Sequence, residues 1–197
     1  PYLLEYVLPM KAYMVPLLIT YVIPQFAFTP VFIWLSRKYG KKRLWCTTMW
    51  ASAFMFILTF FVVTPGEFSY LIWPGTFIFG LCGGCAAVTA PSIKADIIDF
   101  DEYKTGERKE GAYLAVWNLI RKGAGSLTAL VTGLALQFSG FMPNIEQNEQ
   151  VQYWILGLFS LLPGICYLIG AIIFMGFSFN EKEHAAVREV LEARRAE

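Results

Sequence analysis

The fold is decided by residues 112–138, AYLAVWNLIRKGAGSLTALVTGLALQF, an apolar stretch long enough to cross a bilayer with one lysine, Lys122, near its middle. Counted from Gly111 at about 1.5 Å per residue, Lys122 lies roughly 16 Å along the helix. That depth is close to the centre of a hydrocarbon layer about 30 Å thick. Burying a lysine there costs about 2.5–3.5 kcal/mol. We therefore expect Lys122 to face a water-filled cavity, a counter-charge or a substrate.

The composition of the chain is that of an integral membrane protein. Its 197 residues are 56% hydrophobic and 17% aromatic, far outside the range of a soluble domain. The net charge of +1 gives no indication of a nucleic-acid partner. Cys82 and Cys85 form a CxxC in a run of small residues, a setting that favours helix packing over a metal or redox site. No ligand cluster, activated nucleophile or phosphate loop is visible, so the sequence argues against an enzyme.

Five apolar stretches predict five membrane-spanning helices in one all-α bundle. They are residues 12–35, 44–63, 70–95, 112–138 and 153–179, which together make a transmembrane domain over 12–179. Residues 1–11 are interpreted as the outer end of a preceding helix or the loop after it, so the chain is expected to be a piece of a longer one. Residues 180–197 predict a short cytoplasmic surface helix with Asn180 as its N-cap.

Basic residues alternate between the predicted loops and set the expected orientation. The first loop carries a basic run of Arg37, Lys38, Lys41, Lys42 and Arg43 around Gly40. The third loop and the C-terminal tail carry the other loop cations, and only Lys11 falls on the opposite side. The positive-inside rule therefore predicts that the basic loops and the C-terminus are cytoplasmic. We expect a multi-pass protein of the plasma (bacterial inner) membrane. The basic run could equally anchor the protein on anionic membrane lipid.

One face of the fourth predicted helix is small and polar. Asn118, Lys122 and Ser126 recur at i, i+4 and i+8, which places them in one row. A charge at the centre of such a row favours an aqueous cavity, and we take these residues as candidates for a substrate and cation site. Trp117 beside them could stack on a ligand or serve only in packing. Arg121 could extend to the membrane surface or enter an ion pair.

A second candidate group lies at the end of the third predicted helix. Asp96 and Asp99 are one helical turn apart in the membrane interface, where partly desolvated carboxylates require a cation. Arg108, in the following loop, is the nearest residue able to bind them in a bidentate manner. The other charges of this loop, Glu102 among them, are interpreted as solvated.

These motifs together resemble one known family. Residues 95–112, ADIIDFDEYKTGERKEGA, and residues 120–126, IRKGAGS, resemble the glycoside-pentoside-hexuronide:cation symporters, the melibiose-permease-like branch of the major facilitator superfamily. The family pattern is an acid pair, a cytoplasmic loop ending in Arg-x-Glu-Gly or similar, and a lysine fourteen residues after the arginine. All of these are present, and the likeness extends over the whole chain.

The resemblance implies that the chain is the C-terminal bundle of a twelve-helix transporter, helices eight to twelve. It implies that Lys122 lines the central cavity near the sugar and cation sites, and that Asp96, Asp99 and Arg108 form a cytoplasmic gate. The coupling cation would be Na⁺, Li⁺ or H⁺, bound largely by an N-terminal bundle, with no other cofactor and no metal site in this chain. Ile33 and Arg37 stand where the superfamily's first-loop motif has glycine and aspartate, which weakens a gating role for that loop.

Two alternatives remain open from the sequence. A related carrier of this branch could move a lysolipid or another amphiphile in place of a sugar. A non-transporting membrane scaffold would also be rich in apolar helices, but it would tolerate the replacement of Lys122 by leucine.

Overall fold

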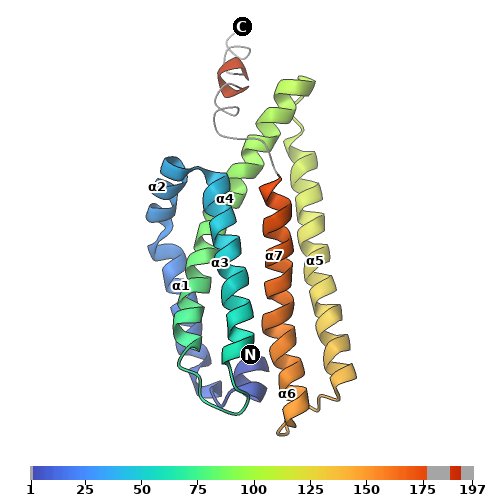
Figure 1. Ribbon diagram of the computed structural model, residues 1–197. Helices are drawn as coiled ribbons and strands as arrows, with labels where there is room; N and C mark the ends of the chain where they lie inside the picture. The colour runs from blue at the N-terminus through green and yellow to red at the C-terminus, as the bar shows by residue number, and fades with distance from the viewer. Residues whose placement is uncertain (1, 177–186, 192–197) are drawn as a thin grey trace.

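The computed structural model describes residues 2–176 and 187–191, and the part of the chain up to Met175 is helical apart from short connections. The elements are the π-helical turn η1 (Leu3–Val7), the 3-10 turn η2 (Lys11–Tyr13), α1 (Met14–Ala27), α2 (Thr29–Tyr39), α3 (Lys41–Val62), α4 (Ile72–Thr105), α5 (Glu110–Ser139), α6 (Glu149–Leu156), the π-helical turn η3 (Gly157–Leu161) and α7 (Leu162–Met175). Figure 1 shows the long helices running up and down beside one another, as expected for a transmembrane bundle.

Three of the described helices are long and apolar enough to cross a membrane: α3, α4 and the continuous helix from Glu149 to Met175. The α1–α2 pair makes a fourth if it is one span, bent by 50°. The expected number was five. The predicted fourth span forms α5, which is long enough but is too polar to be counted, because Asn118, Arg121 and Lys122 interrupt its apolar sequence.

The bend in the first span has a local cause. Helix α1 ends at Ala27, and Pro30 stands in the first turn of α2. Proline has no N–H to bond to the carbonyl four residues earlier, and its ring crowds that carbonyl, so a continuous helix is interrupted here. The residue at the junction, Phe28, has φ −93° and ψ 2° and belongs to neither helix.

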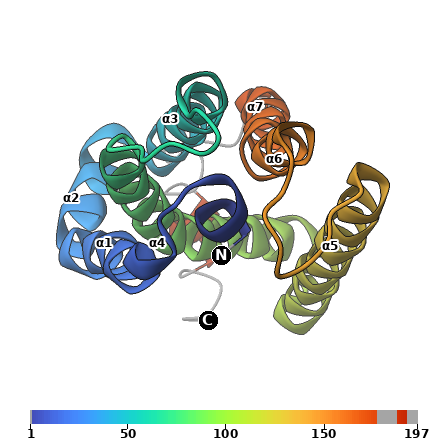
Figure 2. The same ribbon diagram turned by 90° about the horizontal axis from the view of Figure 1, so that it is seen from below.

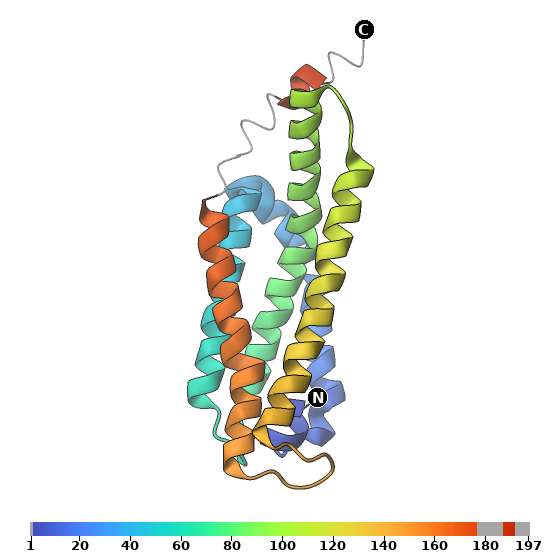
Figure 3. The same cartoon turned by 90° about the vertical axis from the view of Figure 1, so that its right-hand side faces the viewer.

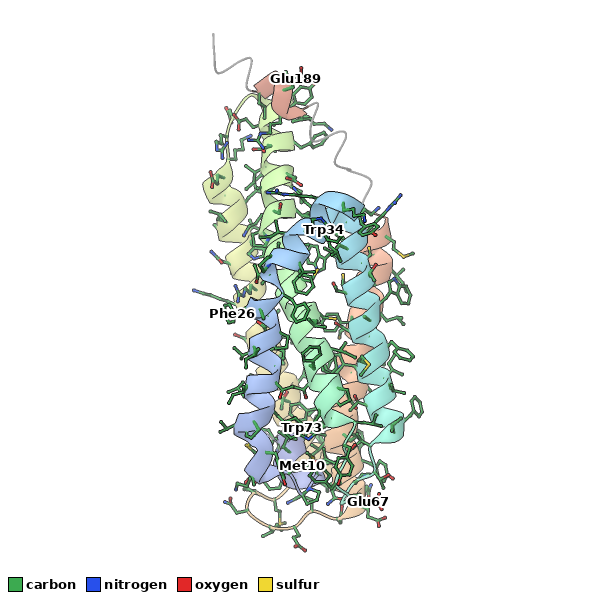
Figure 4. All side chains as sticks on the ribbon, turned by 90° about the vertical axis from the view of Figure 1, so that its left-hand side faces the viewer. Met10, Phe26, Trp34, Glu67, Trp73 and Glu189 are labelled. Carbon is green, nitrogen blue, oxygen red and sulfur yellow. The ribbon has the colours of Figure 1, made fainter. Side chains whose placement is uncertain are left out.

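The predicted connection over residues 36–43 is corrected by the structure. Arg37 and Lys38 form the last turn of α2, and Lys41 begins α3. Gly40 alone links the two helices, at a φ of +92° that glycine adopts without steric cost. We call this end of the bundle, where α2 meets α3, the basic end. In Figure 4, Trp34 marks the basic end, and Met10 and Glu67 mark the opposite end.

Helix α4 continues past the predicted span end at residue 95. It runs to Thr105 and stops at Gly106, whose left-handed φ of +75° suits a helix C-terminus. Asp96 and Asp99 therefore lie within a helix, and α4 extends well past the basic end in Figure 3. Of the predicted tail helix 180–197, the structure describes residues 187–191, which are helical with Val187 and Leu191 buried. The rest of that prediction, Asn180 included, lies outside the described residues.

Helix α4 is the centre of the bundle, and α5 is the least packed helix. α4 packs against α1, α2 and α3, and α3 also packs against α7. α5 packs mainly against α6 and contains no buried residue. Viewed from below in Figure 2, α5 stands apart from the α1, α3 and α4 group. The structure therefore leaves most of the surface of α5 exposed.

Two glycines allow α4 to approach α1 closely. Gly80 and Gly84 form a GxxxG pair on the face of α4 that meets α1. A Cβ at Gly84 would lie 2.8 Å from the Cα of Gln25 and 2.9 Å from its carbonyl oxygen. A Cβ at Gly80 would collide with the carbonyl oxygen of Tyr21. Cys82 and Cys85 are buried in the same segment as free thiols, in keeping with a packing role.

Replacing Gly84 by alanine is expected to destabilise the α1–α4 interface, because the obstacle is backbone that cannot rotate away. Overpacking of this kind costs about 1–3 kcal/mol. The measurement is the melting temperature of the detergent-solubilised protein, which should fall. Gly133→Ala is the matched control, since nothing lies within 4 Å of a Cβ on that α5 glycine. An unchanged melting temperature for Gly84→Ala would contradict the close approach.

Candidate functional site

A buried ion pair joins α3 to α4 at the basic end. The ammonium of Lys41, the first residue of α3, donates to both carboxylate oxygens of Asp96, at 2.8 Å to Oδ1 and 2.7 Å to Oδ2. Asp96 is only 8% exposed, so the pair is shielded from the solvent. At low exposure a charge-assisted contact of this geometry holds the two helices together more strongly than a surface ion pair would.

Arg108 forms a second charged group between α4 and α5. Its Nη1 lies 3.2 Å from Glu102 and 3.9 Å from Asp99, both on α4. Its Nη2 lies 3.2 Å from Glu110, the first residue of α5. The hydrogen bond with Glu110, with Glu102 contributing less, raises the pKa of Arg108 further above its ordinary value. One guanidinium thus connects the end of α4 to the start of α5.

The structure divides the predicted Asp96, Asp99 and Arg108 group. Asp96 pairs with Lys41 of the basic run, while Asp99 is the more distant of the carboxylates around Arg108. Glu102, which we expected to be solvated, has a side chain only 14% exposed and contacts Arg108 more closely than Asp99 does. The spacing of Glu102, three residues after Asp99 on the same helical face, was the signal that could have identified it.

The two ion-paired groups make one charged layer that involves four helices. Asp96 and Asp99 are one turn apart on α4, so the Lys41 pair and the Arg108 pair lie next to each other along that helix. Lys42 adds a contact to α7 through a 2.9 Å hydrogen bond to the carbonyl of Met175. The layer therefore involves α3, α4, α7 and the start of α5.

The polar row on α5 is exposed. Asn118, Lys122 and Ser126 are all solvent-accessible in the described bundle. Among the described residues no carboxylate lies within ion-pair distance of Lys122. The lysine is thus presented on the helix that packs least with the rest of the bundle. Because its side chain is exposed, a counter-charge or a ligand that is not part of the described residues can reach Lys122.

Trp117 lies on a different side of α5 from this row. It precedes Asn118 by one residue, which is about 100° around a helix. The ammonium of Lys94 on α4 lies 5.1 Å from the centroid of the Trp117 ring, a cation–π contact. Trp117 lines an apolar groove whose lining does not include Asn118, Lys122 or Ser126. The four predicted cavity residues therefore form a row of three and a separate tryptophan.

An apolar groove of about 680 Å³ lies between α1, α3 and α4. Its lining includes Leu18, Met55, Phe56 and Phe79, with Tyr21 supplying one of few polar groups. Within residues 2–176 and 187–191, no group of three or more His, Cys, Asp or Glu side chains is placed to hold a metal ion.

Comparison with known proteins assigns the helical bundle to a family. Residues 1–181 match the family described as MFS/sugar transport protein. The chain belongs to this family. Its members are transporters, which excludes an enzyme and confirms the resemblance to major facilitator symporters drawn from the acid pair, the loop and Lys122.

Members of the family that resemble the chain include proteins of different cargo. An uncharacterized symporter of Bacillus subtilis is 35% identical over 98 residues, 49% of this chain and 21% of that protein. An Escherichia coli protein provisionally named a sulfoquinovose importer is 28% identical, covering 80% of this chain and 33% of the relative. A sodium-dependent lysophosphatidylcholine symporter of Danio rerio is 22% identical, and the match covers 84% of this chain and 32% of that relative. The chain spans a third or less of these relatives, and it aligns with the C-terminal third of this family's symporters.

Proposed function

We propose that this chain is the C-terminal part of a secondary active transporter that couples the movement of a sugar or glycoside to Na⁺, Li⁺ or H⁺ by alternating access. The observation that carries the proposal is the exposed lysine of the polar row on α5, in a chain of the sugar-transport family. A lysine in an apolar span is retained when it serves an ion or substrate pathway.

In this proposal Lys122 and its neighbours Asn118 and Ser126 face the transport cavity. The N-terminal bundle of the full-length carrier supplies carboxylates on the other side, and these bind the coupling cation together with the lysine. Asn118 and Ser126 offer hydrogen bonds to sugar hydroxyls. The ring of Trp117, which contacts the ammonium of Lys94, supports the wall of the site on a side of α5 next to the row.

The charged layer at the basic end acts as the gate on the cytoplasmic side. The excess of lysine and arginine at this end supports that orientation. When the carrier is open to the outside, the Lys41–Asp96 pair and the Arg108 group keep the basic end closed. Opening toward the cytoplasm separates contacts of this layer, and cation and sugar shift the balance through their unequal affinities for the two states.

A related function, the transport of a lysolipid, is favoured by one observation. The 680 Å³ groove between α1, α3 and α4 is lined by apolar side chains, which suit an acyl chain better than a sugar. The Danio rerio relative is named for such a cargo. The two functions differ in which solute is accumulated against its gradient, so one assay separates them.

The experiment is uptake by the full-length carrier in reconstituted vesicles. Labelled galactosides and a labelled lysophospholipid are offered in parallel under imposed Na⁺, Li⁺ or proton gradients. We expect a galactoside to accumulate only when one of these cation gradients is present, and to leave when an ionophore removes it. Accumulation of the lysophospholipid alone would replace the sugar with the lipid, and no accumulation of either would reject the symporter.

A further inference from the structure

A second groove, of about 590 Å³, lies between α3, α4, α5 and α7 and is separate from the polar row. Its walls are almost entirely apolar and aromatic. They include Trp45, Ile93, Val116, Ile120 and Phe174. The groove exists because α5 packs against α6 and leaves its other end apart from α7. Neither the row of Lys122 nor the charged layer uses this space.

Lys94 is the one charged side chain in the described lining of this groove. Its ammonium lies over the ring of Trp117, and no described carboxylate pairs with it. Lys94 is two residues before Asp96, the start of the charged part of α4. The groove therefore presents one cation, Lys94, at the edge of an apolar surface.

The depth of the groove places this cation at the level of the lipid headgroups. Trp45 is one turn from Lys41, and Phe174 precedes Met175, whose carbonyl binds Lys42. The upper rim thus coincides with the charged layer. The groove follows α5 from Tyr113 to Ile120, which is about 10 Å toward the membrane centre at 1.5 Å per residue. This length is shorter than one half of the hydrocarbon layer, about 15 Å.

We propose that this groove binds one anionic phospholipid. The phosphate pairs with Lys94 at the rim, beside the amphipathic rings of Trp117 and Tyr113, which favour the membrane interface. One acyl chain lies along Val116 and Ile120, in contact with the apolar side chain of Phe174 from α7. A bound lipid fills the space between α5 and α7 and so supports the helix that carries Lys122.

The test is lipid retention by the full-length carrier in detergent, measured by native mass spectrometry. Phosphatidylglycerol, phosphatidylcholine and glycerol phosphate are added separately to the wild type and to three variants. Lys94→Gln removes the cation, Val116→Trp fills the groove, and Lys104→Gln is the control. Lys104 lies over the ring of Phe100 on the same helix, so the control removes a similar cation–π lysine outside the groove.

We expect Lys94→Gln to weaken phosphatidylglycerol binding about fivefold, the contribution of one lysine near an anionic headgroup. Val116→Trp should abolish this binding, and Lys104→Gln should leave it unchanged. Size-exclusion profiles identical to wild type show that each variant is folded. Equal phosphatidylglycerol retention by Lys94→Gln and wild type would overturn the site. So would equally tight binding of phosphatidylcholine, or full displacement of the lipid by glycerol phosphate, which carries no acyl chain.

Discussion

Replacement of Lys122 by alanine is expected to abolish uptake driven by a cation gradient. The variant removes the only cation of the polar row Asn118–Lys122–Ser126, so carboxylates facing it in the full-length carrier would lose their counter-charge. Those carboxylates would then hold the coupling cation or a proton in both conformations, and the cation would no longer bias alternation between them. We expect accumulation ratios to fall to the value reached without a gradient.

The measurement is initial-rate and steady-state uptake of labelled galactoside in reconstituted vesicles. Exchange of sugar at equal concentrations on both sides tests whether the variant still binds and moves its cargo without coupling. Lys122→Arg keeps the charge and should retain part of the accumulation. Lys104→Ala, at the exposed end of α4, is the matched control and should transport normally. Full accumulation by Lys122→Ala or Lys122→Leu would reject the role of this lysine in coupling.

Disruption of the Lys41–Asp96 pair is expected to weaken closure of the basic end. Asp96→Asn removes the carboxylate charge that faces the Lys41 ammonium, whose side chain is only 24% exposed. The loss of a hydrogen bond between charged groups costs about 1.5–3 kcal/mol. If the pair is made in the outward-open state and broken in the inward-open state, the equilibrium moves about tenfold or more toward the inward-open state. Uptake slows because the outward-open carrier becomes scarce.

A double-mutant cycle separates this effect from general destabilisation. Lys41→Asp combined with Asp96→Lys restores opposite charges in exchanged positions and should recover a part of the rate that each single variant loses. The opening itself is followed by alkylation of a single cysteine placed at the basic end, which should react faster in Asp96→Asn. Asp101→Asn on the same helix is the control. Additive losses in the double variant would show that the pair does not act as a unit.

Many features of this protein follow from its sequence alone, because the bilayer interior offers no hydrogen-bond partners to the backbone. Apolar stretches as long as residues 44–63 and 70–95 can satisfy their backbone in lipid only as helices, so the all-α class follows from composition. The CxxC of Cys82 and Cys85 among glycines predicted packing, and the contact of Gly84 with Gln25 is of that kind. The acid pair, the loop and Lys122 pointed to the symporter family, which the match over residues 1–181 confirms.

Other features depend on which helices pack together, and the sequence of one segment does not show which other segments it contacts. The partner of Asp96 is Lys41, which is 55 residues away in the chain, whereas the sequence favoured the nearer Arg108. Glu102 became part of the Arg108 group because α4 continues to Thr105 and turns that side chain toward the arginine. Trp117 met Lys94 rather than joining the row of Lys122, because one residue along a helix changes the face by about 100°.

The sequence by itself determined the helical class, the family and the candidate lysine, since each depends on hydrophobicity, spacing or motif along a single segment. Only the tertiary structure decided which charges pair at the basic end, how closely α1 approaches α4, and that a groove with one cation opens between α5 and α7. Ion pairs and grooves are made between segments, and their energies depend on distances that are set when the helices pack.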